Sequence, residues 1–228
     1  LKLSSFEAAN GGYDFSSDEF DGFLQVLDIA QELGMKVDIA FSFADAKRDS
    51  ATVSQGVTAL IDYLVTQRRY NCLSDVTILG SIPQSSAESY ESYFSAIDSA
   101  LTAASLREGI SLISTFDDTV KEFGADVVSD EYARAMYYAD FAVNAINDGT
   151  ASLYASAFFD MNVLSDGSTD MTSQGLLGNK SEGFAPKPLY HAYGMLVKFC
   201  RPDSLVFPMD FGTEGVSGTY LLDTNGKS

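Results

Sequence analysis

The sequence has very little histidine and cysteine, which limits the metal and redox chemistry that it can support. Its one histidine, His191, cannot build a histidine-rich metal site, and we interpret it as an ordinary side chain of a helix. The two cysteines, Cys72 and Cys200, are far apart and match no metal-ligand spacing. They could pair only if the fold brings them together. We favour two buried free thiols, which leaves the redox compartment open.

An excess of positive charge is also missing. The chain has 14 Lys and Arg against 32 Asp and Glu, a formal net charge of −18 at pH 7. Nucleic acids and anionic membranes attract Lys and Arg, so this balance argues against both as partners. No run of about 18 apolar residues occurs, so no membrane insertion is predicted. The first residues have no signal-peptide pattern, and a mature secreted protein would have lost one.

What the sequence does have is a regular alternation of predicted strands and helices. Strands are predicted at Met35–Phe43, Asp75–Gly80, Gly109–Thr115 and Ala151–Phe159, with a helix between each pair. This spacing suits a parallel sheet with crossover helices. A doubly wound sheet and a TIM barrel both fit. The absence of a G-x-G-x-x-G or Walker sequence favours the barrel, although four strands are fewer than its eight.

Capping residues predict where two of the helices begin and end. Ser16 or Ser17 is predicted to cap a helix that Gly34 closes. Ser129 is predicted to cap a later helix that ends at Asp148-Gly149. These assignments place the long helices before the first predicted strand and before the last one.

The character of the sequence changes near its end. From Asp203 onward, "SLVFPMD" and "GVSGTYLLDTNGKS" predict short β segments with a turn at Asn225-Gly226. We therefore predict a barrel-like domain over residues 1–202 and the start of a β module over residues 203–228.

Several segments, taken in chain order, carry a resemblance to a known family. They are "FDGFLQVLDIAQELGMKVDIAFSF", "LIDYLVTQRRYNCLSDVTILGSIPQ", "YFSAIDSALTAASLREGISLISTFDD", "KEFG", "YARAMYYADFAVNAINDGTASLYASAFFDMN" and "PKPLYHAYGMLVKFCRPDSLVF". This ordered set resembles the clan A glycoside hydrolases, the retaining TIM-barrel glycosidases. The resemblance implies an incomplete or degenerate (β/α)8 barrel, followed by the start of an accessory β module.

The resemblance also implies a function. It suggests hydrolysis of a polysaccharide or oligosaccharide, with a carbohydrate substrate or ligand as the partner and no cofactor, because two carboxyl groups suffice for this chemistry. It favours a secreted or cell-surface location. The main structural competitor is a smaller α/β sheet protein.

The resemblance assigns candidate site residues. Glu122, in "KEFG", resembles the family's nucleophile at the end of strand seven; without the resemblance it would read as a surface acid. Asp117 and Asp118 end a predicted strand, where they could bind sugar hydroxyls or cap a loop.

The end of the last predicted strand suggests a sugar platform. Phe159, Asp160 and Asn162 combine an aromatic ring with polar groups, which suits a ring face against sugar C–H bonds and hydrogen bonds to hydroxyls. Strand alternation predicts that one of Phe158 and Phe159 is in the core.

Two departures from the family pattern raise a second hypothesis. Ile82 stands where the family has its acid/base glutamate, and isoleucine transfers no proton. Glu88 and Glu91 lie nearby, but the first turn of a helix explains them better. The second hypothesis is therefore a catalytically inactive barrel that binds glycan or a protein partner.

The other departure is a shortage of residues between Asp118 and Lys121, where the family has several further elements. Either the natural chain is contracted, or segments of a longer barrel are missing. In the second case, the predicted strands at 110–115 and 152–159 would not be neighbours. Direct pairing of the two would instead indicate a contracted sheet.

Overall fold

The structure is a computed structural model that describes residues 3–8, 11–42, 50–79, 90–116, 130–155, 157–160, 162–165, 168–171, 175–209, 211–213 and 216–226. The chain divides into two compact units. The first comprises Leu1–Ser114 and Thr150–Ser152, and the second comprises Thr115–Gly149 and Leu153–Ser228. The separate division predicted between residues 202 and 203 stays a prediction.

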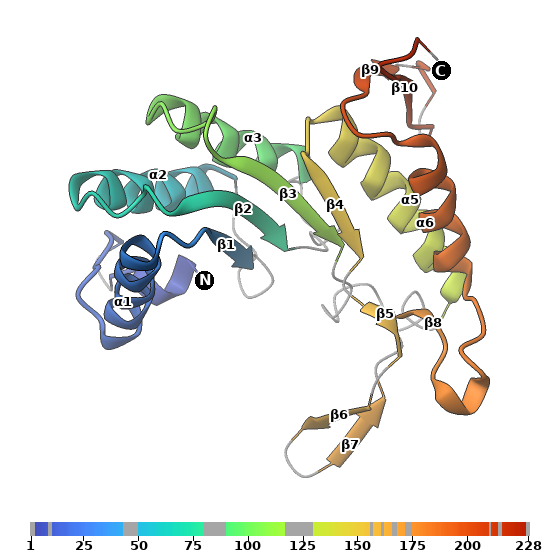
Figure 1. The fold of residues 1–228 in the computed structure, drawn as a ribbon, viewed down its shortest axis with the longest axis horizontal. Coiled ribbons are helices and arrows are strands. Elements are labelled where there is room, and N and C mark those ends of the chain that lie inside the picture. Colours follow the sequence, from blue (N-terminus) through green and yellow to red (C-terminus); the bar gives the residue numbers. More distant parts are fainter. Residues whose placement is uncertain are drawn as a thin grey trace. The chain divides into compact units, whose positions relative to one another are not determined.

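A four-stranded sheet has the strand order β1-β2-β3-β4. The strands are β1 (Val37–Ser42), β2 (Leu73–Leu79), β3 (Ser111–Phe116) and β4 (Ser152–Ala155). β1 and β2 pair in parallel, and the arrows of β1, β2 and β3 run the same way (Figure 1). α2 (Ser50–Thr66) connects β1 to β2, α3 (Tyr90–Ala103) connects β2 to β3, and the two helices pack together. The described residues thus form an α/β fold with a parallel sheet and no closed barrel.

The strand order separates the two architectures that the sequence left open. Strands that follow one another in the chain are also neighbours in the sheet. In a doubly wound sheet, the order of the strands reverses at a switch point. The order of these four strands shows no such reversal. Right-handed crossovers that advance in one direction place their helices on one face of the sheet, as in a barrel. The order therefore favours part of a barrel-like sheet over the doubly wound alternative.

β3 and β4 are neighbours in the sheet, which is the arrangement that indicates a contracted sheet. The Ala151 N–H donates to the Leu112 carbonyl at 2.7 Å, and the Ser114 hydroxyl lies 2.9 Å from the Thr150 hydroxyl. Separated strands, which are expected if barrel segments are missing, are not what the structure has. Of the two alternatives, the pairing of these residues favours the contracted sheet.

The core of the first unit follows from the period of two along its strands. Ile39, Phe41, Val76 and Ile78 are buried, as are Val57, Leu60 and Leu64 of α2. Several alternate positions of β1 and β2 are polar. Asp38 stands opposite Asp75, and the Thr77 hydroxyl donates to the Asp38 carboxylate at 2.6 Å. These two strands therefore have an apolar face toward α2 and polar residues on the other face.

Helix α1 (Asp18–Leu33) covers part of this core together with the 3₁₀ turn η1 (Leu3–Phe6). As predicted, Ser17 caps it: the Ser17 hydroxyl accepts from the Phe20 N–H at 3.2 Å. Gly34 ends it with a φ of 65°. Phe6, Phe15, Phe20 and Tyr63 form an aromatic cluster beside the helix.

In the second unit, α5 (Glu131–Asn147) packs against α6 (Pro188–Phe199). The cap of α5 is Asp130, whose carboxylate accepts from the Tyr132 and Ala133 N–H groups. The prediction of Ser129 was wrong, because the adjacent carboxylate makes the cap. The helix ends at Asp148, as predicted. Phe116, Tyr138, Ala142, Leu176 and Leu189 form the buried core.

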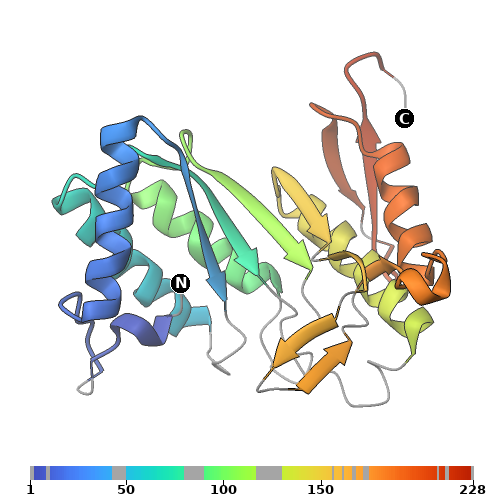
Figure 2. The same ribbon diagram turned by 60° about the horizontal axis from the view of Figure 1, so that its bottom comes forward.

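The predicted strand at 151–159 is divided. β4 ends at Ala155, and β5 (Ala157–Phe159) pairs in parallel with β8 (Gly175–Leu177). β6 (Asn162–Ser165) pairs antiparallel with β7 (Ser168–Met171) (Figure 2). The 3₁₀ turn η2 (Lys180–Glu182) follows β8. The prediction of one continuous strand was therefore wrong, because β5 finds its partner in a later segment.

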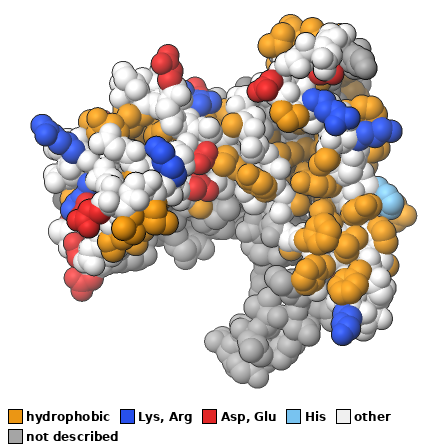
Figure 3. All heavy atoms as spheres, viewed as in Figure 1, with side chains coloured by type: hydrophobic (Ala, Val, Ile, Leu, Met, Phe, Trp, Pro, Cys, Tyr) orange, Lys and Arg blue, Asp and Glu red, His pale blue; other side chains and the backbone are white. Residues whose placement is uncertain are grey.

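The two predicted C-terminal β segments are present, and they pair with each other as a hairpin. β9 (Leu205–Met209) pairs antiparallel with β10 (Gly218–Leu222). The Asn147 amide on α5 donates to the Gly218 carbonyl at 3.1 Å and ties the hairpin to the helix. Figure 3 shows apolar side chains gathered over the second unit. The exposed ones on α6 and β9 are Tyr190, Met195, Val197, Phe199, Leu205, Val206, Phe207 and Met209.

The cysteines are free in the structure, with Cys72 buried and Cys200 half-buried. The interpretation as two free thiols therefore fits, although Cys200 is less buried than expected. Burial raises the pKa of both thiols. None of the described helices is both long and apolar enough to cross a membrane.

Tyr138 gives a stability prediction for the second unit. Its side chain is fully buried, and its hydroxyl has no hydrogen-bond partner among the described residues. Burial raises the pKa of this phenol well above its usual 10.0. Replacing Tyr138 by Phe removes an unsatisfied group, so we expect the free energy of unfolding at pH 7 to rise by about 1 kcal/mol.

The same variant should change the alkaline limb of the stability profile. Above pH 10 the phenol ionises in the unfolded chain and stays protonated in the folded chain, so stability falls as the pH rises. Tyr138→Phe should reduce this fall in urea unfolding measured between pH 7 and 11. Tyr132→Phe, on the same helix with an exposed side chain, is the control and should change little. A loss of stability in Tyr138→Phe at pH 7 would contradict the prediction.

Candidate functional site

The candidate site lies where the chain leaves β4. β5 begins two residues after β4 ends, and Figure 1 shows β5 beyond the tip of the β4 arrow. Phe159 ends β5 and stands opposite Leu177 of β8. In parallel α/β sheets, ligands bind at the carboxyl ends of the strands. This position makes the described residues around Phe159 the best candidate for a binding site.

Three exposed phenylalanines gather there, and we call them the aromatic platform. Phe158, Phe159 and Phe184 have 64%, 41% and 45% of their surface exposed. The ring centroids of Phe159 and Phe184 are 6.0 Å apart with an interplanar angle of 76°. Those of Phe158 and Phe159 are 6.5 Å apart at 82°. The prediction that one of Phe158 and Phe159 is in the core was wrong, because the short β8 is the only partner of β5 among the described strands.

Phe184 reaches the platform from a tightly closed turn. Asn179 and Glu182 form a capping box around η2. The Phe184 N–H donates to the Asn179 carbonyl at 3.1 Å, and the Gly178 N–H donates to the Ala185 carbonyl at 2.8 Å. Sequence reasoning missed Phe184. The capping-box pattern "NKSE" was a readable signal for the turn, but nothing local indicated that the ring meets Phe159.

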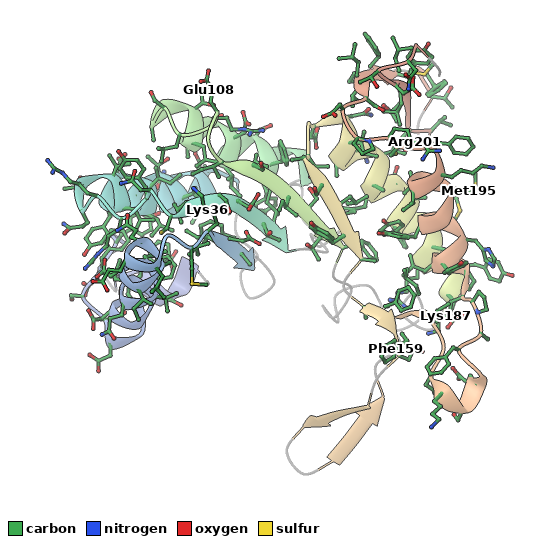
Figure 4. The ribbon with its side chains drawn as sticks, in the orientation of Figure 1. Lys36, Glu108, Phe159, Lys187, Met195 and Arg201 are labelled. Atoms are coloured by element: carbon green, nitrogen blue, oxygen red, sulfur yellow. The ribbon has the colours of Figure 1, made fainter. Side chains whose placement is uncertain are left out.

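A buried ion pair is formed by two residues that follow the platform residues in the chain, Asp160 after Phe159 and Lys187 after Phe184. The Lys187 ammonium is 2.6 Å from Asp160 Oδ2, with side-chain exposures of 10% and 6%. It is also 3.0 Å from Glu131 Oε1, which is more exposed. The Gly175 N–H donates to Asp160 Oδ1 at 2.7 Å. Both Asp160 oxygens therefore have protein partners. Figure 4 shows Phe159 and Lys187 in this part of the second unit.

Gly175 is required for this arrangement. A Cβ at this position would overlap the backbone of Phe159 and Asp160. The missing side chain lets β8 approach β5 closely enough for the Gly175 N–H to reach the Asp160 carboxylate. The ion pair and the β5–β8 contact together hold Phe159 in place.

Several predicted site residues lie elsewhere in the chain. Asp117, Asp118 and Glu122, together with Ile82, lie outside the described residues. Asn162 begins β6, but its side chain is not among those described. Of the predicted set, the structure describes the side chains of Phe159 and Asp160, which are adjacent in the chain. Within the described residues, no group of His, Cys, Asp and Glu side chains could hold a metal ion.

The chain positions of the undescribed candidates are nevertheless informative. Residues 80–89, which include Ile82, follow the carboxyl end of β2, and residues 117–129, which include Glu122, follow that of β3. In βα barrels, the connections after the strands supply the catalytic residues. Any catalytic role of these connections is a proposal.

Comparison with known proteins gives little support for any family. No protein-family model matches the chain, and no curated protein matches it. A solved structure of a family 39 glycoside hydrolase from the gut symbiont Bacteroides cellulosilyticus WH2 is similar with a TM-score of 0.38 and 13% identity. The match covers 98% of this chain and 64% of that one. At this TM-score, the likeness carries no argument about fold or activity.

Proposed function

We propose that this chain is part of a retaining glycoside hydrolase that acts on a polysaccharide or oligosaccharide. The observation that carries the proposal is the aromatic platform beyond the carboxyl end of β4, in a sheet whose strands follow one another in sequence order. The ordered sequence resemblance to clan A glycosidases supports it independently. Within this proposal, residues 1–202 form the barrel-like catalytic domain.

The platform suits a sugar because of the chemistry of both partners. One face of a pyranose ring carries C–H groups with partial positive charge, and the face of an aromatic ring is negative. Phe159 can therefore stack on a sugar. Asp160 is buried with both oxygens engaged, so within the proposal it positions Phe159. Asp117, Asp118 and Asn162 remain proposed contacts for sugar hydroxyls.

The proposed chemistry needs two carboxyl groups about 5 to 5.5 Å apart. Glu122 attacks the anomeric carbon and forms the glycosyl-enzyme, while a second carboxyl group protonates the leaving oxygen. That group then removes a proton from the water that releases the sugar. No cofactor takes part in either step.

A second function is a barrel that binds glycan without hydrolysing it. Ile82 favours this alternative, because it occupies the position of the family's acid/base glutamate and carries no proton to transfer. Both functions use the aromatic platform. They differ in whether the bound sugar is cleaved.

One experiment separates the two functions. Binding of soluble oligosaccharides is measured by calorimetry, and release of reducing ends is measured in the same samples. Binding with hydrolysis supports the glycosidase. Binding without hydrolysis in the complete natural protein supports the alternative, and the absence of both binding and hydrolysis overturns the two proposals together.

A further inference from the structure

We infer that Phe184 forms the second wall of a corner-shaped subsite that holds one neutral pyranose unit against Phe159. This inference rests on the proposed function, that the chain binds carbohydrate, and adds to it a residue and a ligand geometry. The two rings meet at 76° with centroids 6.0 Å apart. In a nearly perpendicular pair the edge of one ring meets the face of the other, and the two residues keep 41% and 45% of their surface exposed. Together the two rings form a corner.

The backbone conformation of Phe184 is the strongest argument that its ring binds a ligand. Its φ is 56°, in the left-handed region where bulky side chains are uncommon. The other described residues with positive φ, glycine apart, are Arg68, Ser105 and Asp203, which are all polar. A glycine or asparagine would make the same turn with less strain. Strain of this kind persists where the surroundings enforce it, and it gathers at binding sites.

The exposure of Phe184 is a second feature that contributes little to the folding free energy. Phe184 has 45% of its surface exposed, although burial of an aromatic ring is a major source of folding free energy. A strained backbone and an exposed ring therefore coincide at one position. Neither the strain nor the exposed part of the ring stabilises the fold, and within the inference contact with a ligand accounts for both.

The two walls are fixed before a ligand arrives. Phe159 is held by the β5–β8 pairing and by the ion pair of Asp160 with Lys187. Phe184 is held by the turn that Asn179 and Glu182 close. A binding surface that is already ordered loses little conformational entropy when it binds. This arrangement favours recognition of a small rigid unit such as a sugar ring.

The charges beside the corner favour a neutral sugar over an acidic one. The Asp160 carboxylate and the Lys187 ammonium neutralise one another and are both buried. The Glu131 carboxylate, which also pairs with Lys187, is more exposed and would repel an acidic sugar. One face of a pyranose stacks on the first ring, the C–H groups at its edge meet the second, and its hydroxyls remain toward water.

The test is calorimetric binding of neutral gluco-, xylo- and manno-oligosaccharides to the whole chain. Phe184→Ala should weaken binding about tenfold, the loss expected for one stacked ring. Phe184→Tyr keeps a ring face and should bind within about twofold of the parent. Phe207→Ala removes another exposed ring of the same unit, from β9, and should leave binding unchanged.

Phe184→Gly keeps the inference testable if the alanine variant folds poorly. Glycine adopts a positive φ without strain, so this variant should unfold at the same temperature as the parent or higher and still lose binding. Binding by Phe184→Gly equal to that of the parent would overturn the inference and leave the proposed function standing. Equal losses in Phe184→Ala and Phe207→Ala would overturn it as well, because they would show general apolar adhesion. A parent chain that binds no oligosaccharide overturns both.

Discussion

Replacing Glu122 by Gln is expected to lower glycoside hydrolysis by about a thousandfold or more and to leave stability unchanged. Glutamine keeps the size and polarity of the side chain but is not nucleophilic, so the glycosyl-enzyme cannot form. A residue in the connection after β3 that serves the ligand makes little contribution to core packing. Hydrolysis rates and urea unfolding of the parent and the variant are measured side by side.

The choice of substrate and control variant determines how specifically the experiment tests Glu122. Aryl glycosides with an acidic phenol leaving group need little protonation, so they test Glu122 even where the acid/base residue is weak or absent. Glu108→Gln, at an exposed acid after α3, is the matched control and should keep full activity. Hydrolysis that survives Glu122→Gln would remove this residue from the mechanism. Equal losses in both variants would point to a general effect of charge.

Local sequence signals predicted the individual elements well. Apolar runs located β1, β2 and β3 to within about two residues, because burial on one face leaves a clear pattern in a short strand. Ser17 and Gly34 fixed the ends of α1, since capping depends on a few adjacent residues. The wrong prediction of Ser129, in place of Asp130, as the cap of α5 has the same origin. Two adjacent residues can both cap a helix, and the pattern alone does not choose between them.

Contacts between distant segments could not be predicted in the same way. The division between β4 and β5 depends on β8, which follows the β6–β7 hairpin in the chain. Nothing within 151–159 signals that its last residues pair elsewhere. The exposure of both Phe158 and Phe159 has the same cause. Asp160 was recognised as a polar residue at a strand end, but its burial depends on Lys187, which follows much later in the chain.

Family spacing agreed with one local feature and disagreed with the topology. Phe159 and Asp160 were predicted at the end of a strand, and β5 does end at Phe159. Family spacing also implied further elements between β3 and α5, yet β3 and β4 are neighbours. The proposed corner-shaped subsite also contains Phe184, which neither family spacing nor hydrophobic periodicity indicated. Its place depends on a closed turn, and a turn's direction is set by the groups that close it.

Replacing Lys187 by Met is expected to cost about 3 to 5 kcal/mol of stability, the usual effect of leaving a buried charge without its partner. The Asp160 carboxylate is only 6% exposed, and in this variant its remaining partner is the Gly175 N–H. Methionine has a similar length and fills the space of the lysine stem, so the loss reports the charge and not a cavity. Urea unfolding at pH 7 measures it.

A double variant separates the ion pair from the packing around it. Changing Lys187 to Met and Asp160 to Leu together removes both charges, and apolar replacements of buried pairs are often close to neutral. We therefore expect the double variant to be more stable than Lys187→Met alone, with a coupling of about 1 to 3 kcal/mol. Lys180→Met, at an exposed lysine of η2, is the control and should stay within about 0.5 kcal/mol of the parent.

The ion pair also links stability to the proposed sugar site. Phe159 precedes Asp160 directly, and Phe184 lies shortly before Lys187, so the pair fastens both segments of the corner. Lys187→Met should therefore weaken oligosaccharide binding even at temperatures where the chain stays folded, whereas Lys180→Met should not. Full binding by a folded Lys187→Met variant would show that the rings hold their positions without the pair. A stability loss below about 1 kcal/mol would show that Lys187 and Asp160 are solvated as an ordinary surface pair is.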